Sequence, residues 1–165
     1  MGKTFVINVF LVLLISCQGD KNSAIEEETS TFKISTEKWQ KKANLSAKSK
    51  EVSKDWAEFI ALETSFDAIY TVNNVEDLSL VLEDLIEKQK LLKASKHPLL
   101  FDRAQIKSRQ KVFHTFILKT KGDLIYRTDV QNSVQQMIEA HNALVDQMNT
   151  ITGNTLDLKT LLDEA

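Results

Sequence analysis

One histidine and two methionines occupy core-type heptad positions near the end of the chain and could together bind a soft metal ion. They are His141, Met137 and Met148. Imidazole nitrogen and thioether sulfur are ligands that suit copper(I). Methionine also fills irregular gaps in helical cores, and a core histidine can hydrogen-bond across a bundle. We therefore expect no metal and no other cofactor. The alternative is a small-ligand or metal-binding bundle centred on His141, Met137 and Met148.

The other histidines and the carboxylates form no recognisable catalytic set. Di-iron sites in bundles need Glu-x-x-His pairs, whereas Glu139 is only two residues from His141. His97 precedes Pro98 and His114 has lysines nearby, so both are expected to be solvated. No serine lies in a nucleophile elbow, and the sequence has no glycine-rich phosphate loop. These features favour a protein that is not an enzyme.

The only cysteine, Cys17, follows a short apolar segment. Lys3 supplies a positive start, and residues 5–16 are largely apolar. Such a segment has the length of a signal-peptide core, whereas a membrane-spanning helix needs about 20 residues. A single cysteine also excludes an internal disulfide and a four-cysteine zinc site. The position of Cys17 is therefore better explained by processing than by structure.

The four residues Leu14-Ile15-Ser16-Cys17 resemble the lipobox of bacterial lipoproteins. The resemblance implies a signal peptide over residues 1–16, cleavage between Ser16 and Cys17, and acyl chains on Cys17. Two or more chains make membrane anchoring stable. Gln18 stands where an aspartate would suggest retention in the inner membrane. The resemblance therefore implies a lipid-anchored protein of the bacterial cell envelope, in the outer membrane, on its periplasmic or its surface face.

After the cysteine, the chain divides into a tether and a body. Residues 17–35 are mostly polar and without an apolar period, so we expect a lipidated cysteine and a flexible tether with a reach of about 25 Å. Residues 36–165 have the periodicity of helices and are expected to form one helical bundle domain. The chain of 165 residues has only four glycines and one proline. Long helices tolerate such a composition better than sheets with tight turns.

Four main helices are expected in the body. They are predicted over residues 47–70, 75–94, 102–125 and 129–152, with short helical segments over 37–44 and 156–162. Asn74 and Asp77 form a cap-like pair at the start of the second helix, and Gly153 is expected to end the fourth. Because short connections favour antiparallel neighbours, the predicted fold class is all-α, an up-down antiparallel bundle of four main helices.

Basic residues gather at two places that this topology would bring together. The candidate membrane-facing basic pole consists of Lys48, Lys50, Lys54, Lys93, Lys96, Arg103 and Lys107. The tether is expected to leave from the same end, so that the pole would face an anionic bilayer. The alternative is that these side chains only solvate helix ends and complement the helix dipole. The net charge of −2 gives no general attraction to nucleic acid, and none is expected as a partner.

The sequence thus predicts a membrane-anchored envelope lipoprotein that acts as a non-enzymatic helical interaction module. Its expected partners are the membrane, through the lipid anchor, and a protein that the sequence does not identify. The body also resembles small uncharacterised helical lipoproteins, a resemblance that carries no functional residues.

Overall fold

All regular secondary structure in the described part of the molecule is helical. The computed structural model describes residues 34–128 and 130–163, with side chains up to Asn154. Within these ranges the chain forms five α-helices and one short 3-10 helix, without strands. The helices are α2 (Ala47–Ser53), α3 (Ala57–Asp67), η1 (Ala68–Thr71), α4 (Val75–Ala94), α5 (Ala104–Ile125) and α6 (Val130–Asp163). The predicted all-α class is confirmed.

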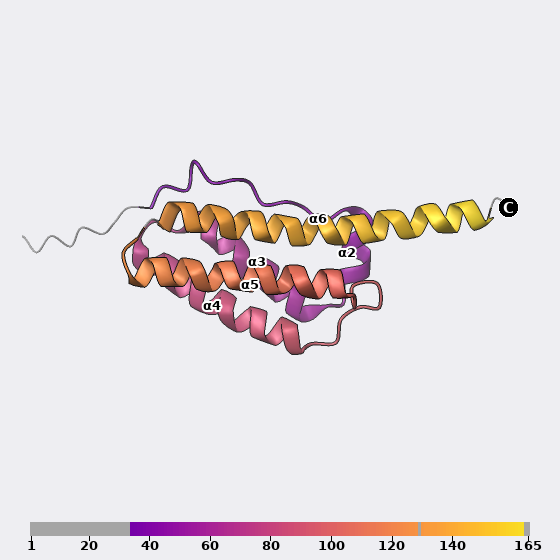
Figure 1. Ribbon diagram of the computed structural model, residues 1–165, viewed down its shortest axis with the longest axis horizontal. Coiled ribbons are helices and arrows are strands. Elements are labelled where there is room, and N and C mark those ends of the chain that lie inside the picture. The colour runs from indigo at the N-terminus through magenta and orange to yellow at the C-terminus, as the bar shows by residue number, and fades with distance from the viewer. Residues whose placement is uncertain (1–33, 129, 164–165) are drawn as a thin grey trace, which may run out of the picture. The chain divides into compact units, whose positions relative to one another are not determined.

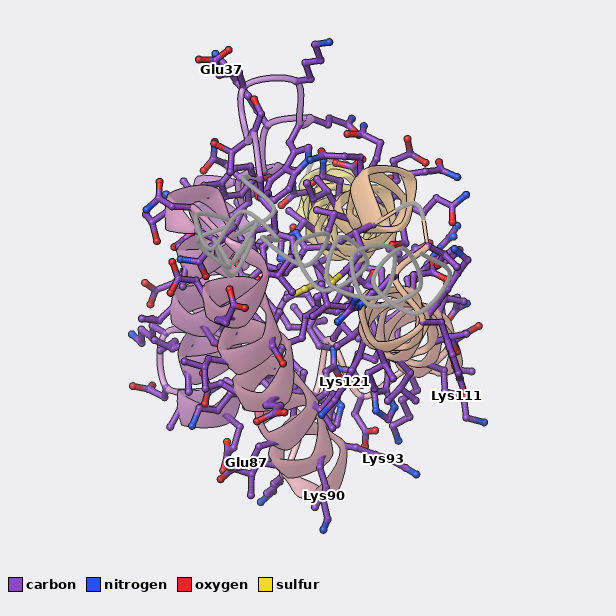
Figure 2. All side chains as sticks on the ribbon, turned by 90° about the vertical axis from the view of Figure 1, so that its left-hand side faces the viewer. Glu37, Glu87, Lys90, Lys93, Lys111 and Lys121 are labelled. Atoms are coloured by element: carbon purple, nitrogen blue, oxygen red, sulfur yellow. The ribbon has the colours of Figure 1, made fainter. Side chains whose placement is uncertain are left out.

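Helices α3 to α6 follow one another through short connections and form an up-down antiparallel bundle (Figure 1). Their inward faces are mainly apolar, with some buried polar side chains such as those of Gln89, Gln110 and Thr120. The largest buried side chains include Phe59, Phe66, Phe101, Phe113, Leu62, Leu78, Leu82, Ile106 and Ile117. Burying one such side chain contributes roughly 1.5–3 kcal/mol to folding. Charged side chains such as those of Lys90, Lys111 and Glu37 project outward when the bundle is viewed along its helices (Figure 2).

The second predicted helix matches α4 because its ends carry strong capping signals. Asn74 accepts the backbone N–H of Asp77 at 2.7 Å, which satisfies one of the free donors of the first turn. Glu76 and Asp77 lie in the first turn and Lys93 in the last turn, as the helix dipole favours. At the other end, the backbone N–H of Ser95 donates to Leu92. The bounds predicted from the sequence are therefore those observed.

The first predicted helix, over residues 47–70, is wrong as a single element. It is divided into α2, α3 and η1, because the chain turns between Ser53 and Trp56. Ser49 packs α2 against α6, whereas the indole N–H of Trp56 donates to Ser95 at the end of α4, at 2.8 Å. A straight helix cannot reach both neighbours, so packing outweighs the local helix preference.

Two other predicted helix ends also differ from the structure. α6 continues through Gly153, where an end was predicted, because an interior glycine costs only about 1 kcal/mol relative to alanine. α5 begins after Arg103, and Asp102 pairs with Lys107 without capping the helix. The carboxylate of Asp102 therefore contributes an exposed ion pair, which is worth little to stability.

The short helix expected over residues 37–44 does not form. Residues 34–46, which we call the strap, run beside α6 as an extended segment with one turn near Trp39 (Figure 1). The strap begins where Ile34 donates its backbone N–H to Asn73, just before α4. It ends at Ser46, whose side chain caps α2. The strap therefore spans most of the length of the bundle.

Candidate functional site

A row of amide side chains on α6 holds the strap in place. Asn142 accepts the backbone N–H of Ala43 at 2.7 Å and donates to the carbonyl of Lys41 at 2.9 Å. Asn149 repeats this arrangement two turns later, on the backbone of residues 44–46. An extended backbone segment needs partners for its polar groups, and one amide side chain offers both an acceptor and two donors. Each asparagine thus supplies the hydrogen bonds that a neighbouring strand would otherwise provide.

Two glutamines continue this row toward the start of α6. Gln131 accepts the indole N–H of Trp39 at 2.7 Å, and Gln135 accepts the backbone N–H of Gln40 at 3.1 Å. The four amides, at positions 131, 135, 142 and 149, have spacings of four and seven and so share one face of the helix. Residue numbers rise together in the strap and in α6, so the two run parallel.

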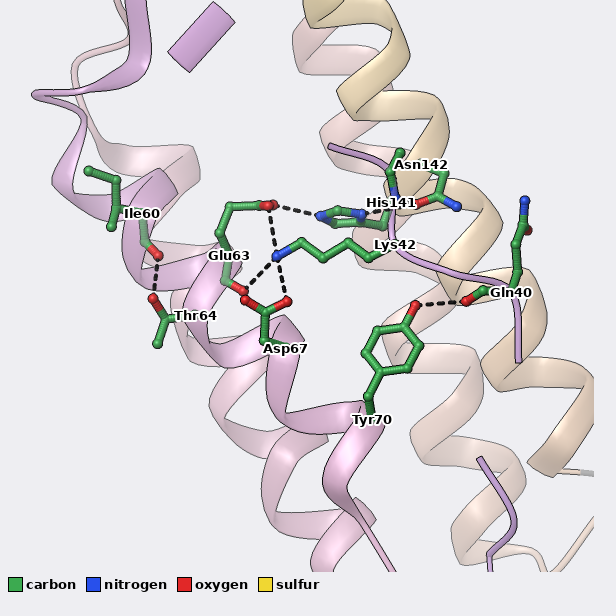
Figure 3. A network of polar contacts seen from close by, with 10 residues as sticks. Gln40, Lys42, Ile60, Glu63, Thr64, Asp67, Tyr70, His141 and Asn142 are labelled. Carbon is green, nitrogen blue, oxygen red and sulfur yellow. Dashed lines mark hydrogen bonds and ion pairs between the residues drawn. The ribbon is translucent and has the colours of Figure 1, made fainter. Parts of the chain in front are cut away.

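A histidine–carboxylate pair lies in the middle of the bundle, beneath the strap. His141 is 0% exposed, and its Nε2 lies 2.6 Å from Glu63 Oε1 (Figure 3). The imidazole stacks on Phe66 with ring centroids 4.0 Å apart and meets the edge of Phe113 at 5.3 Å. The expected core histidine that hydrogen-bonds across the bundle is therefore present, and its partner is Glu63 of α3.

Lys42 of the strap completes the pair on its solvent side. Its Nζ lies 3.0 Å from Glu63 Oε2 and 2.7 Å from Asp67 Oδ1, and it also donates to the carbonyl of Glu63 at 3.1 Å (Figure 3). The chain His141–Glu63–Lys42 thus ties α6, α3 and the strap together. Removal of any one partner would leave a buried charge less well paired, which is costly.

The pKa of Glu63 is lower than its usual value. Burial alone would raise the pKa of this carboxyl, but the hydrogen bond from His141 and the charges of His141 and Lys42 outweigh that effect. Glu63 is therefore ionised at neutral pH and accepts a hydrogen bond, so the Nε2 atom of His141 carries a proton. Glu63 thus forms an ion pair with Lys42 and accepts a hydrogen bond from His141.

Two aromatic residues fix the first half of the strap. Trp39 is 8% exposed and meets the ring of Tyr70 edge to face, at 6.4 Å between centroids. The hydroxyl of Tyr70 donates to the carbonyl of Gln40 at 2.8 Å. Burial and the nearby Asp67 raise the pKa of Tyr70 to about 12, so this donor persists throughout the physiological pH range.

A surface pocket of roughly 410 Å³ lies between the strap and helices α2 and α3. Its lining comprises Lys42, Ala43, Asn44, Leu45, Lys50, Ser53, Lys54, Phe59, Ile60, Glu63, Thr64 and Asp67. Lys42, Glu63 and Asp67 already pair with one another inside it. The pocket therefore offers a small ligand few polar groups that would gain a new partner on binding.

The candidate soft-metal residues lie in the closed core. Met137, His141 and Met148 are each 0% exposed, and the Nε2 atom of His141 faces Glu63. Across the described residues, no group of three or more His, Cys, Asp or Glu side chains could hold a metal ion. The hydrogen bond to Glu63 occupies the Nε2 atom of His141, and the metal alternative at these residues stays a prediction.

The seven residues of the basic pole are all exposed and gather at one end of the bundle, which we call the basic end. Trp56, just after α2, donates to Ser95 and packs on His97 at 4.7 Å, which joins the start of α3 to the loop after α4. His97 also contacts Ser95 and Gln110, so it is half-buried and not solvated as expected. The bundle topology thus brings Lys48, Lys50 and Lys54 to the same end as Lys93, Lys96, Arg103 and Lys107.

The expectation that the chain reaches the body at this basic end is wrong. Ile34 meets Asn73 at the opposite end, beside the start of α4, and Trp39 bonds Gln131 near the start of α6. We call this the proximal end. The error has one cause, because residues 37–44 were expected to form a compact helix and instead extend along the bundle. A membrane-facing role for the basic pole loses its geometric support.

Sequence reasoning missed the residues that hold the strap. Glu63 was overlooked because a single glutamate on an amphipathic helix usually faces water. One available signal was the row of amides at spacings of four and seven along residues 131–149, where a solvated helix would carry more charge. Asn142 follows His141 directly, but the two point in different directions: His141 bonds Glu63 inside the bundle, and Asn142 holds the strap.

Ser16 and Cys17, and with them the expected lipidation and cleavage site, lie outside the described residues. Where the structure is described, no helix is both long enough and apolar enough to cross a membrane. Comparison of the chain with protein-family models, with curated proteins and with solved structures finds no match. The fold and the strap are therefore interpreted from this chain alone.

Proposed function

We propose that the protein is a lipid-anchored lipoprotein of the bacterial cell envelope whose helical body is a non-enzymatic interaction module. The anchor would be Cys17, within Leu14-Ile15-Ser16-Cys17. The body would present one end to the membrane and the other to a protein partner.

The strap carries this proposal. A segment that follows a lipid anchor transmits any pull on the body, and here it is bonded along α6 by Gln131, Gln135, Asn142 and Asn149. The ionic bridge from Lys42 to Glu63 adds a contact to a second helix. Because the strap begins at the proximal end, an anchor that precedes it would hold the body by that end. It suits a protein that must be displayed in one orientation.

The basic end supplies the surface for the partner. Leu99 is 91% exposed in the loop after α4, between Lys96 and Arg103. An apolar side chain in a basic surround fits a partner with an apolar pocket and an acidic rim, in which charge steers association and the apolar contact holds it. We place the partner site here because this end lies away from the start of the strap.

Two measurements in the producing cell test the proposal. Cys17→Ala should leave an unprocessed or mislocalised precursor, and processed, membrane-bound protein in this variant would contradict the lipid anchor. A photo-crosslinking amino acid at Leu99 should capture one defined protein. The same residue at Leu80, which is exposed near the opposite end of α4, serves as the matched control. Equal capture at both positions would contradict a partner site at the basic end.

A further inference from the structure

The turn between α5 and α6 exposes two large apolar residues at the proximal end. Ile125 is 64% exposed and Tyr126 is 80% exposed. Both lie at the end of α5, where an amphipathic helix would usually carry polar residues toward water. With Arg127 they form a surface that we call the tip.

The backbone of this turn fixes how the tip is presented. The N–H of Thr128 donates to Asp123 at 2.9 Å and that of Arg127 to Leu124 at 3.3 Å, the paired bonds of a Schellman helix end. Arg127 has a φ of 54°, in the left-handed region where glycine is the usual residue. Arginine adopts this left-handed conformation at a higher energy than glycine would. We infer that the side chain of Arg127 compensates for this cost through a contact of its own.

The chain reaches the body at this same end. Ile34 meets Asn73 in the turn before α4, and α5 returns to that level because it runs antiparallel to α4. If residues 17–33 form a flexible coil, they span roughly 20–25 Å. α4 has 20 residues and is therefore about 30 Å long. An anchor at Cys17 would therefore put the tip within reach of the bilayer. If the tip touches the bilayer and the bundle stands upright on it, the basic end lies about 30 Å farther away, beyond a Debye length of about 8–10 Å.

We propose that the tip, made of Ile125, Tyr126 and Arg127, docks on the lipid bilayer that holds the anchor. This inference rests on the proposed lipid anchor. An aliphatic side chain can enter the acyl boundary, a tyrosine suits the headgroup region, and an arginine binds lipid phosphate. One lipid anchor leaves the body free to tumble, whereas a second contact at the tip would orient it. The basic end would then face away from the membrane.

The contact can be tested with two single tryptophan reporters in the full-length lipidated protein. Tyr126→Trp is the tip reporter, and Leu99→Trp is the control reporter, placed on the most exposed apolar residue of the basic end. The native Trp39 and Trp56 are 8% and 3% exposed and should contribute a constant background. Each variant would be reconstituted into vesicles of phosphatidylethanolamine and phosphatidylglycerol, with and without brominated phosphatidylcholine as a quencher.

We expect the emission of the tip reporter to shift to the blue and to be lost when the brominated lipid is present, while the emission of the control reporter is unchanged. Quenching of the control reporter, or quenching of neither reporter, would overturn the proposal. Flotation of the vesicles and mass analysis of the Cys17 peptide test the lipid anchor separately from the docking of the tip. Protein that carries lipid and floats, but whose tip reporter is not quenched, contradicts the tip alone. Protein without lipid contradicts the anchor itself.

Discussion

The two ends of the bundle differ in both charge and connection. The proximal end receives the strap at Ile34 and exposes Ile125 and Tyr126. The basic end gathers seven exposed cationic side chains around the exposed Leu99. Charge alone would assign the basic end to an anionic membrane, whereas the path of the strap, combined with the proposed lipid anchor, favours the proximal end. The difference teaches that a basic surface indicates its partner only once the attachment point of the chain is known.

The largest expected effect comes from removing the first anchor of the strap. Trp39→Ala should lower the free energy of unfolding by about 3–5 kcal/mol, the usual cost of truncating a buried tryptophan. It should also release the start of the strap from the bundle, so that the chain is no longer attached at the proximal end. Urea denaturation measures the first effect, and amide hydrogen exchange at Ile34 and Gln40, near the start of the strap, measures the second. Glu37→Ala, on an exposed neighbour, should change stability by less than about 0.5 kcal/mol. Equal effects of the two substitutions would contradict the role of Trp39.

The ionic bridge should hold the middle of the strap in a pH-dependent way. The pKa of Glu63 in the folded protein lies below the value of about 4.3 for an unfolded glutamate. Glu63 therefore stabilises the fold fully above that value, and the contribution is lost as the pH falls through the lower folded-state pKa. Glu63→Gln should cost about 2 kcal/mol near neutral pH. Urea denaturation from about pH 6 down to about pH 3 should show this gap to the parent protein closing. A gap that stays constant would mean that the charge of Glu63 is unimportant.

The amide clamp nearest the basic end should have a smaller effect. Asn149→Ala removes two hydrogen bonds to the strap backbone and should cost about 1–2 kcal/mol. Exchange protection should fall at Ser46 and stay nearly unchanged at Ala43, which Asn142 holds. Uniform loss of protection along the strap would show that the clamps act as one unit.

Replacing the arginine of the tip with glycine should make the protein more stable. Arg127→Gly should raise the free energy of unfolding by about 1 kcal/mol, because glycine adopts the left-handed conformation without steric cost. Arg127→Ala keeps that cost and serves as the control. If glycine brings no gain over alanine, the backbone at this turn is not strained.

The smallest effect is expected from metal. Copper(I) added to the purified protein should leave the unfolding temperature unchanged, because a ligand stabilises only a fold that it binds. A stoichiometric copper that is lost in His141→Leu would instead favour the site at His141, Met137 and Met148. That variant should keep its helices, although Glu63 would lose the hydrogen bond from His141 and keep the ion pair with Lys42.

The sequence predicted helices wherever local signals agree with packing. α4 has a capping asparagine, acids in its first turn and an apolar stripe, so its bounds could be predicted closely. The heptad of α6 placed His141 in the core for the same reason. Around Trp56 the local signals and the packing disagree. The helical pattern of the sequence continues from α2 into α3, but the hydrogen bond from Trp56 to Ser95 turns the chain between them.

The candidate site could be predicted only in part. Clustering of the basic residues followed from antiparallel topology, which short loops indicate. The strap could not be predicted, because its backbone groups hydrogen-bond to side chains far along the chain. Asn142, for example, accepts the N–H of Ala43 across a separation of 99 residues. No local pattern reports such a pairing. The wrong attachment end followed directly from this omission.

The central claim, that the chain reaches the body at the proximal end, can be tested by distances between paired spin labels. Labels would be attached to cysteines introduced as Glu37→Cys with Asn73→Cys, and as Glu37→Cys with Leu99→Cys, in a chain carrying Cys17→Ala. We predict a short distance for the first pair and a distance of about 30 Å, the length of α4, or more for the second. A short distance between positions 37 and 99 would contradict the strap and the orientation drawn from it.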